Sequence, residues 1–440
     1  MKKLQIMVVA LVALLGVSCN GDSKSKKGVD LAGPSHVEMK QVDGKYRLYV
    51  NGEEFFVKGA GCEFGGCNIV AHHGGNSIRT WRVNNGRKTG KEVLDDAWEH
   101  GLMVMMGLDV AKERHGFDYN NEVAVAEQLE RLKSEVISLK DHPALLGWGI
   151  GNELNLRHTN KRVWNAVNDI AKMIKEVDGN HVVTTMLAGI GKDEVDYIRE
   201  NCPDIDFLSI QMYGDIINLK TRLAEAGYDG PYLVTEWGAT GHWEMPSTQW
   251  GSPIEQTSTE KADAIKLRYE KVIVGDDANC MGSYVFLWGQ KQERTPTWYG
   301  LFTEKGEKTE AINVMEYLWT GKWPEKIAPK VKNALIVDKG GRFDNVKLSA
   351  NGLYTAKVEI EHFNEAILNV RAEIMPEPLE LSDGGDFEQR PTTIEGLIVS
   401  ATTSEVVFNA PAQKGAYRLF IYVADDNANV GTVNIPFLIE

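Results

Sequence analysis

The sequence is short of cysteine, of basic side chains and of long apolar runs, and each shortage excludes a class of protein. Five cysteines in 440 residues are too few for a disulfide scaffold in a chain of this size. The formal net charge of −14 leaves no basic footprint for nucleic acid or another polyanion. Beyond residue 19 no apolar run is long enough to cross a bilayer. The body of the chain is therefore predicted to be globular, with a neutral partner.

The cysteines do not indicate a metal site. Cys62 and Cys67 are followed by His72 and His73, but the spacing matches no common zinc finger, and Gly65 and Gly66 indicate a tight turn. We predict no metal and no cofactor. A disulfide and two packed thiols both stay open for this cysteine pair, since an extracytoplasmic address would permit the disulfide.

Residues 1–19 have the pattern of a secretory signal. Lys2 and Lys3 precede an apolar stretch from Leu4 to Leu15, which is too short to span a membrane. The stretch ends at Cys19 and resembles a bacterial lipoprotein signal, which implies a lipid on Cys19 and contact with the membrane only through that anchor. Residues 20–34 are rich in Gly, Ser, Lys and Asp and are predicted to form a flexible tether. We expect an extracytoplasmic, lipid-anchored protein in the periplasm or at the cell surface; secretion without a lipid is the alternative.

Residues 35–325 are predicted to form a (β/α)₈ TIM barrel. After a hairpin with an Asn51-Gly52 turn, eight apolar strand runs alternate with helical stretches such as Glu122–Leu139. Strands buried on both faces are typical of such barrels. A doubly wound sheet is the alternative, but no Gly-rich phosphate turn follows the first strand. The eight runs are Phe55–Ala60, Ser77–Arg82, Leu102–Leu108, Leu145–Gly151, His181–Leu187, Phe207–Tyr213, Tyr232–Glu236 and Gly282–Trp288.

Residues 326–440 have a different sequence pattern. Short predicted strands of alternating apolar and polar residues, separated by turn signals, run from Leu335–Val337 to Thr432–Leu438. This pattern predicts an immunoglobulin-like β-sandwich, although the Cys–Trp–Cys core of antibody domains is missing. The segment carries no catalytic constellation, so we expect a support or binding module.

Two barrel strands end on a carboxylate. Glu153 follows the fourth predicted strand and Glu236 ends the seventh. Side chains at the C-terminal strand ends of a barrel meet in one pocket. Two carboxylates in one pocket are what glycoside hydrolysis requires, because one donates a proton to the leaving oxygen while the other attacks the sugar or stabilises its cation.

The barrel resembles the clan A glycoside hydrolases, and family 2 catalytic barrels most of all. Asn152-Glu153 matches the acid/base motif of that clan, and Thr235-Glu236-Trp237-Gly238 matches its nucleophile motif. The resemblance implies a retaining β-glycoside hydrolase that acts on a β-linked oligo- or polysaccharide through a covalent glycosyl-enzyme. The C-terminal module would then be a support or a glycan-binding domain.

The same resemblance implies roles for other residues at the strand ends. Arg79, a charge in an otherwise buried strand, would pair with Glu236, and the Tyr213 hydroxyl would donate to it. Asn152 would hold the sugar 2-hydroxyl. Aromatic rings stack on sugar faces, so we predict Trp288 as the pocket floor, with further substrate contacts from Trp81, Trp243, His242 and Asp109.

Three alternatives remain at this stage. A transglycosylase would use the same site with a sugar hydroxyl as acceptor, and the sequence does not separate it from a hydrolase. An inactive glycan-binding barrel would be expected to lack one of the glutamates, and both are present. A metal-dependent barrel hydrolase is disfavoured because His residues do not recur at strand tips. The following six fall in loops or helices: His72, His73, His100, His115, His142 and His158.

Overall fold

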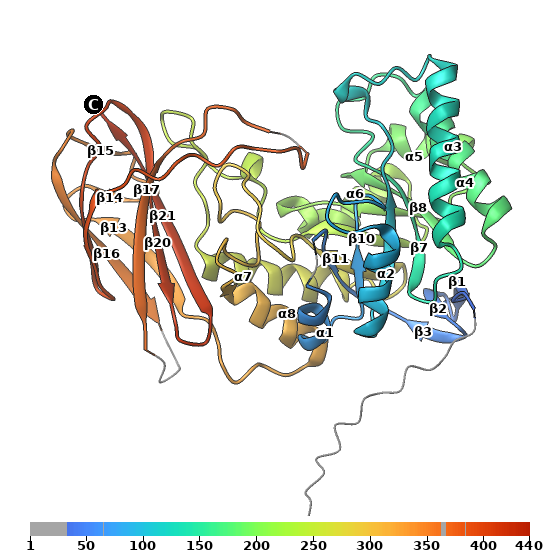
Figure 1. Cartoon of the computed structure of the whole chain (residues 1–440), viewed down its shortest axis with the longest axis horizontal. Coiled ribbons are helices and arrows are strands. Elements are labelled where there is room, and N and C mark those ends of the chain that lie inside the picture. The colour runs from blue at the N-terminus through green and yellow to red at the C-terminus, as the bar shows by residue number, and fades with distance from the viewer. Residues whose placement is uncertain (1–32, 65, 362–366, 383) are drawn as a thin grey trace, which may run out of the picture. The chain divides into compact units, whose positions relative to one another are not determined.

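The computed structural model describes residues 33–440 except 65, 362–366 and 383 (Figure 1). The predicted signal at residues 1–19, the lipidation site Cys19 and most of the predicted tether lie outside the described residues. None of the helices described is both long and apolar enough to span a membrane.

Eight parallel strands close into a barrel in the order β10-β11-β4-β5-β6-β7-β8-β9, which confirms the predicted TIM barrel. Most of their residues are buried, as the continuous apolar runs require. Counted from β4, the strand that precedes Glu153 is the fourth and the strand that contains Glu236 is the seventh, as predicted. The strands are β4 (Val57–Gly61), β5 (Ser77–Arg79), β6 (Met103–Leu108), β7 (Leu145–Asn152), β8 (Val182–Ala188), β9 (Phe207–Gln211), β10 (Tyr232–Trp237) and β11 (Cys280–Val285).

The helices of the barrel begin at local capping signals. Thr89 and Glu92 form a capping box at the start of α2, Thr257 and Glu260 form one at α7, and Asn121 caps α3. Each satisfies backbone N–H groups that have no partner in the first turn. The helices are α1 (Cys67–His72), α2 (Gly90–Glu99), α3 (Glu122–Leu139), α4 (Arg162–Val177), α5 (Lys192–Asn201), α6 (Leu219–Ala226), α7 (Ser258–Arg268) and α8 (Glu310–Thr320), with 3₁₀ turns at Glu113–His115, Gly214–Asn218 and His242–Glu244 and a π-helical turn at Tyr269–Ile273.

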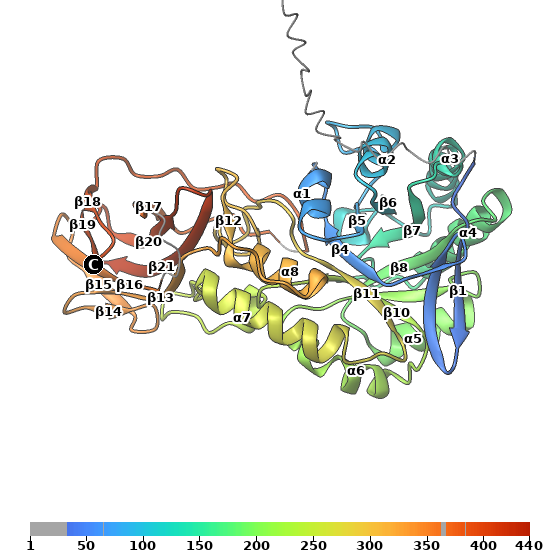
Figure 2. The same ribbon diagram turned by 90° about the horizontal axis from the view of Figure 1, so that it is seen from below.

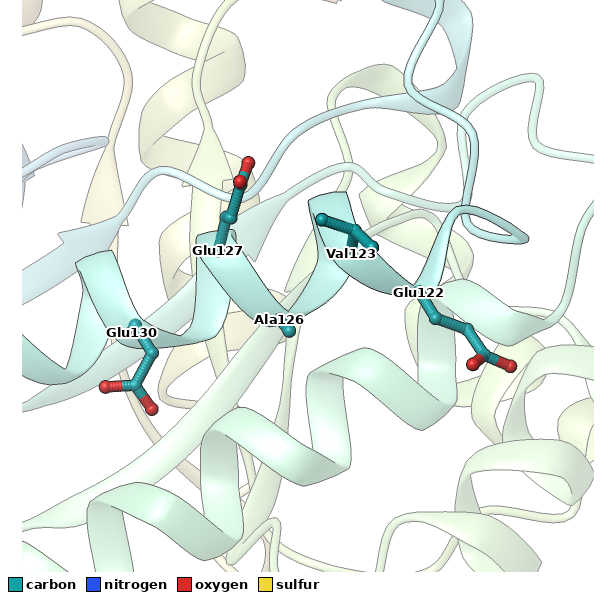
Figure 3. Close-up of a pocket in the computed structure, with 5 residues that line it drawn as sticks. All are labelled: Glu122, Val123, Ala126, Glu127 and Glu130. Carbon is teal, nitrogen blue, oxygen red and sulfur yellow. The ribbon is translucent and has the colours of Figure 1, made fainter.

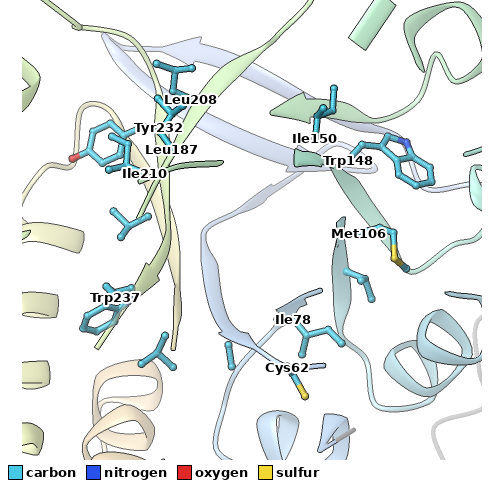
Figure 4. Packing of buried hydrophobic residues seen from close by; sticks show 14 of the residues in the cluster. Cys62, Ile78, Met106, Trp148, Ile150, Leu187, Leu208, Ile210, Tyr232 and Trp237 are labelled. Carbon is cyan, nitrogen blue, oxygen red and sulfur yellow. The ribbon is translucent and has the colours of Figure 1, made fainter. Parts of the chain in front are cut away.

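Helices and strands meet in one large apolar layer around the barrel (Figures 2 and 4). Trp148 on β7 and Trp237 on β10 are fully buried in this layer. All four cysteines of the described chain are buried thiols. Of the two possibilities for Cys62 and Cys67, the structure therefore has the packed thiols and not the disulfide.

A small antiparallel sheet covers the N-terminal end of the barrel. It consists of β1 (Val37–Val42), β2 (Lys45–Val50) and β3 (Glu53–Phe55). Leu48 is fully buried in a core cluster with barrel residues such as Met105 and Leu146. The predicted hairpin is present, with Asn51 and Gly52 at positive φ in its turn. Its second strand is interrupted at Phe56, and the chain then enters the barrel as β4.

The C-terminal part is built from two five-stranded sheets that share one apolar core. This confirms a β domain; its immunoglobulin-like character stays a prediction. One sheet contains β12 (Lys308–Thr309), β21 (Asn429–Ile439), β20 (Gly415–Ala424), β17 (Asn369–Pro376) and β15 (Val346–Leu348), and the other β14 (Gly340–Gly341), β13 (Lys330–Ile336), β16 (Leu353–Glu361), β19 (Glu405–Asn409) and β18 (Ile398–Ala401). Because β12 precedes the predicted boundary at residue 325, the chain crosses between the two parts before that point.

Buried polar side chains join the C-terminal sheets to the barrel. Glu255, which is 1% exposed, accepts hydrogen bonds from Lys261 and Thr295 on the barrel side and from Asn434 on β21. Arg418 on β20 donates to the backbone carbonyl of Pro253 at 2.9 Å. A buried charge is stable only when it is paired, so these contacts fix the two parts against each other.

Candidate active site

Glu153 occupies a backbone conformation that non-glycine residues rarely adopt. Its φ is +53°, and Gly151 two residues earlier has a φ of +70°. The backbone N–H of Glu153 donates to Met186 O at 3.0 Å, and Arg114 donates to the Glu153 carbonyl at 3.2 Å. Positive-φ residues of this kind concentrate at functional sites, where the surroundings hold the strained geometry. Here it turns the chain at the tip of β7 and leaves Glu153 only 9% exposed.

Glu236 is held by four donors that treat its two oxygens differently. Oε1 accepts from Arg79 at 2.9 Å, from Trp81 at 2.8 Å and from Gln211 at 3.1 Å. Oε2 accepts one hydrogen bond, from the Tyr213 hydroxyl at 3.0 Å. Burial and the charge of Glu236 raise the pKa of Tyr213 well above its ordinary value, so this hydroxyl keeps its proton and donates. The carboxylate is therefore fixed in orientation while Oε2 retains room for a further partner.

Asn152 belongs to the same network. Its Oδ1 accepts from Arg79 and from Gln211, both at 2.7 Å. Arg79 and Gln211 thus bridge the tips of β7 and β10, which lie apart in the barrel. Since Oδ1 has two donors already, the amide nitrogen is the part of Asn152 that can serve a ligand. The predicted contact with a sugar hydroxyl then takes the form of donation by the protein.

The two carboxyl groups have unequal electrostatic surroundings. Burial, followed by the negative charge of Glu236, raises the pKa of Glu153 from 4.5 to about 7. The cations Lys112, Arg114 and Arg79 oppose that rise. Glu236 instead has a guanidinium and three neutral donors on its oxygens. One carboxyl group can therefore be protonated near neutral pH beside another that is held by a cation.

Comparison with known proteins shows which families the barrel is similar to. Residues 87–249 match the family model described as glycosyl hydrolases family 2, TIM barrel domain. The barrel is therefore similar to the catalytic barrels of family 2 glycosyl hydrolases. A mannan endo-1,4-beta-mannosidase F from Aspergillus clavatus is 32% identical over 172 residues, which are 33% of this chain and 39% of that protein.

A solved structure gives the same fold at greater coverage. The beta-glucuronidase of Bacteroides uniformis aligns with a TM-score of 0.50 and 14% identity over 91% of this chain and 48% of its own. In both comparisons the chain spans less than half of the relative's length.

Of the other predicted contacts, Trp243 lies beside the carboxylate network, and His242 packs against Trp243. Trp243 is 61% exposed and meets the Tyr213 ring edge to face at 5.6 Å. His242 packs against Trp243 and lies 3.4 Å from a carboxylate oxygen of Glu293. Asp109 follows β6 as predicted, but it is exposed, and the contact found for it is a hydrogen bond from Arg131 to its backbone carbonyl. Trp243 therefore meets the carboxylate network through Tyr213, and His242 packs behind Trp243.

Trp288, which we predicted as the pocket floor, packs toward the helices outside the barrel. Its ring is 4% exposed and stacks on Trp319 of α8, with a centroid distance of 5.4 Å. The aromatic side chain at this strand end that meets the site is Phe286, which packs edge to face against both Trp81 and Tyr213 at 5.9 Å. One residue, Leu287, lies between Phe286 and Trp288, and the chain turns there, so the two rings face different surroundings.

Sequence reasoning missed three other residues and one contact of Trp81. Gln211, one of the donors to Glu236, lies two positions before Tyr213, and a buried amide at a strand end could have been noticed. Lys112 and Arg114 lie after β6, before and in a short 3₁₀ turn with no motif. Trp81, which we predicted to contact sugar, donates its indole N–H to Glu236 and so helps to hold the carboxylate.

A hollow on the surface of α3 does not belong to this site. It is lined by Glu122, Val123, Ala126, Glu127 and Glu130, whose side chains project from one helix (Figure 3). None of these residues belongs to the hydrogen-bond network of Glu153 and Glu236. Within the described ranges, no cluster of His, Cys, Asp or Glu side chains has the grouping needed to hold a metal ion.

Proposed function

We propose that the protein is a retaining β-glycoside hydrolase that uses Glu236 as nucleophile and Glu153 as acid/base. The observation that carries the proposal is the asymmetry of the two carboxyl groups. The pKa of Glu153 is raised to about 7, which suits a proton donor near neutral pH. Glu236 has three donors on Oε1 and one on Oε2, which suits attack by Oε2 from a fixed position.

The reaction then proceeds in two displacements. Oε2 of Glu236 attacks the anomeric carbon while Glu153 transfers its proton to the departing glycosidic oxygen, which leaves a glycosyl ester on Glu236. Glu153, now ionised, removes a proton from water, and the water oxygen displaces Glu236 and restores the starting configuration. Asn152 donates through its amide nitrogen to a sugar hydroxyl. No cofactor takes part.

We place the substrate among β-linked oligo- and polysaccharides. The matched relatives are named as a mannan endo-1,4-beta-mannosidase and a beta-glucuronidase, so β-mannan, aryl β-mannosides and β-glucuronides form the first test panel. If a sugar replaces water in the second displacement, the site acts as a transglycosylase; chromatography of the products distinguishes longer oligosaccharides from hydrolysis products. The signal pattern of residues 1–19 supports an extracytoplasmic enzyme that is anchored by a lipid on Cys19.

Alanine variants of the two glutamates test the roles. A nucleophile is needed for every leaving group, whereas an acid is needed mainly for a poor one. Glu236→Ala should abolish turnover of both natural glycans and activated aryl glycosides. Glu153→Ala should reduce cleavage of natural glycans by about 10³-fold or more, while the first step of an activated aryl glycoside is largely spared.

Added azide separates the roles further. With Glu153→Ala, azide should replace the water that Glu153 activates and yield the β-glycosyl azide, because two inversions retain configuration. Glu127→Ala, which removes an exposed carboxylate from α3, is the matched control and should behave as the unaltered protein. Unchanged cleavage of natural glycans by Glu153→Ala would contradict the assignment, and a product of inverted configuration from the unaltered enzyme would exclude retention.

A further inference from the structure

A segment of the C-terminal β domain contacts the acid/base side of the barrel mouth. It lies between β17 and β18 and is attached to barrel loops at two places. The Asp386 carboxylate accepts a hydrogen bond from His115 at 2.9 Å and lies 3.7 Å from the Arg114 guanidinium. Glu388, which is 4% exposed, accepts from the backbone N–H of Arg294 at 2.6 Å and from Gln292 at 3.1 Å. The segment therefore bridges the loop after β6 and the loop after β11.

Gly384 brings the backbone of this segment against Glu153. Its carbonyl accepts from Arg114 Nη2 at 3.1 Å, and Arg114 Nη1 also donates to the Glu153 carbonyl. A Cβ added at Gly384 would lie 3.1 Å from Glu153 Oε2, 2.9 Å from Arg114 Nη2 and 2.6 Å from Leu156 Cδ2. Gly384 also has a φ of +57°. Only glycine allows the chain to pass this close in this conformation.

The contact concerns the half of the reaction that involves the leaving group. Glu153 Oε2 belongs to the carboxyl group that must reach the glycosidic oxygen, and a displacement of about 1 Å in such a group can cost about 100-fold in rate. Burial is the main reason that the pKa of Glu153 is raised. The backbone at Gly384 lies on the same side of Glu153 as Oε2, within the reach of a single added Cβ. The charged groups around Glu153 are Glu236, Lys112, Arg114 and Arg79, with Asp386 beside Lys112 and Arg114.

We propose that the C-terminal β domain completes the active site, with Gly384 as a positioning residue that holds Arg114 and Glu153 in place for proton transfer to the leaving group. This inference rests on the proposed acid/base role of Glu153. It replaces the expectation, drawn from the sequence, of a module that only supports the barrel or binds glycan. The segment acts through Arg114 and Glu153 and does not itself take part in bond making.

Two neighbouring glycines provide a matched test in the full chain. Gly385 has a φ of +85°, and a Cβ placed there would meet no atom within 4 Å. Gly384→Ala and Gly385→Ala therefore impose comparable backbone strain, but only the former pushes on Glu153 and Arg114. Gly384→Ala should lower kcat/KM for an aryl glycoside with a poor leaving group at least about tenfold, and for a dinitrophenyl glycoside by less than about threefold. Gly385→Ala should change both substrates by the same small factor.

Asp386→Asn is a second variant that does not depend on glycine strain. It weakens the attachment to His115 and Arg114 and should give the same leaving-group bias with a smaller size, whereas Glu395→Gln, an exposed change in the same connection, should give none. Equal losses for good and poor leaving groups in both Gly384→Ala and Asp386→Asn would overturn the inference. If the unaltered protein cleaves no glycoside of the panel, the proposed function fails instead, so the two failures are distinguishable.

Discussion

At the scale of single residues, the two glutamates show how position decides chemistry for identical side chains. Both follow apolar strands, yet Glu153 is enclosed beside a second carboxylate, and Glu236 is surrounded by donors from Arg79, Trp81, Gln211 and Tyr213. Burial without sufficient compensation favours the neutral form of a carboxyl group, and hydrogen bonds to the oxygens favour the charged form. The acid and the nucleophile are thus distinguished by their neighbours.

This difference predicts how pH affects activity. Because the pKa of Glu153 is about 7, kcat/KM for a glycoside with a poor leaving group should fall as pH rises through that value and the proton donor is lost.

Stability should change with pH in a related way. Below pH 4.5 Glu153 is protonated in both the folded and the unfolded chain; between 4.5 and about 7 only the unfolded chain ionises, so the free energy of unfolding falls as pH rises. Glu153→Gln removes this penalty and should be stabilised relative to the unaltered protein by up to roughly 3 kcal/mol more at pH 8 than at pH 4. Urea unfolding at both pH values measures it, with exposed Glu127→Gln as control. A stability difference that does not vary with pH would contradict the expectation.

At the scale of elements, apolar barrel strands present the site residues at their C-terminal ends, and the small β1–β3 sheet closes the opposite end of the barrel. The tips of β7 and β10 present Asn152, Glu153 and Glu236, and Arg79 on β5 links them. The β1–β3 sheet makes no hydrogen bond to these residues, but it fills the barrel end with Leu48 and its neighbours. Elements that stabilise the barrel and elements that bear the chemistry therefore lie at opposite strand ends.

Leu48 separates these two roles experimentally. Leu48→Ala creates a cavity at a fully buried position and should lower the free energy of unfolding by about 2–5 kcal/mol. The folded fraction should keep its KM, since the change is made at the end of the barrel away from Glu153. Denaturant unfolding and steady-state kinetics check both statements. Leu353→Ala is the control. The Leu353 side chain is 65% exposed, so this change should lower the free energy of unfolding only slightly. A change of KM without loss of stability would show that the two ends are coupled.

At the scale of the whole molecule, the barrel and the C-terminal sheets form one structural unit over residues 33–440. Glu255 accepts from Lys261, Thr295, Thr297 and Asn434, and β12 pairs with β21. Removal of the C-terminal part would leave these buried groups without partners, so truncation near residue 326 should destabilise the barrel and also remove the contact of Gly384 with Glu153.

Calorimetry of the full chain tests whether the barrel and the C-terminal sheets unfold together. We expect one unfolding transition, and Glu255→Ala should shift the whole transition to lower temperature with a cost of about 3–5 kcal/mol, because Lys261 is then buried without its carboxylate. Glu395→Ala, at an exposed position, should leave the transition in place. Two separate transitions, of which only one responds to Glu255→Ala, would show that the parts unfold independently.

The sequence by itself determined the barrel, the order of its strands and the two glutamates. Apolar runs and the Asn51-Gly52 turn are local signals, because the backbone conformation of a segment depends first on its own residues. Counting strands then placed Glu153 and Glu236 at one barrel mouth. The resemblance to clan A added Arg79 and Tyr213 as partners of Glu236, and the hydrogen bonds confirm both contacts.

Only the tertiary structure decided what surrounds the two carboxyl groups. Trp288 packs against Trp319, Trp81 donates to Glu236, and Gly384 reaches Glu153 from a strand connection more than 200 residues later in the chain. Such contacts depend on how loops and domains pack, and no local pattern records them. Burial and hydrogen-bond partners set the protonation of a carboxyl group. Because these partners come from segments far apart in the sequence, only the tertiary structure determines the different chemistry of Glu153 and Glu236.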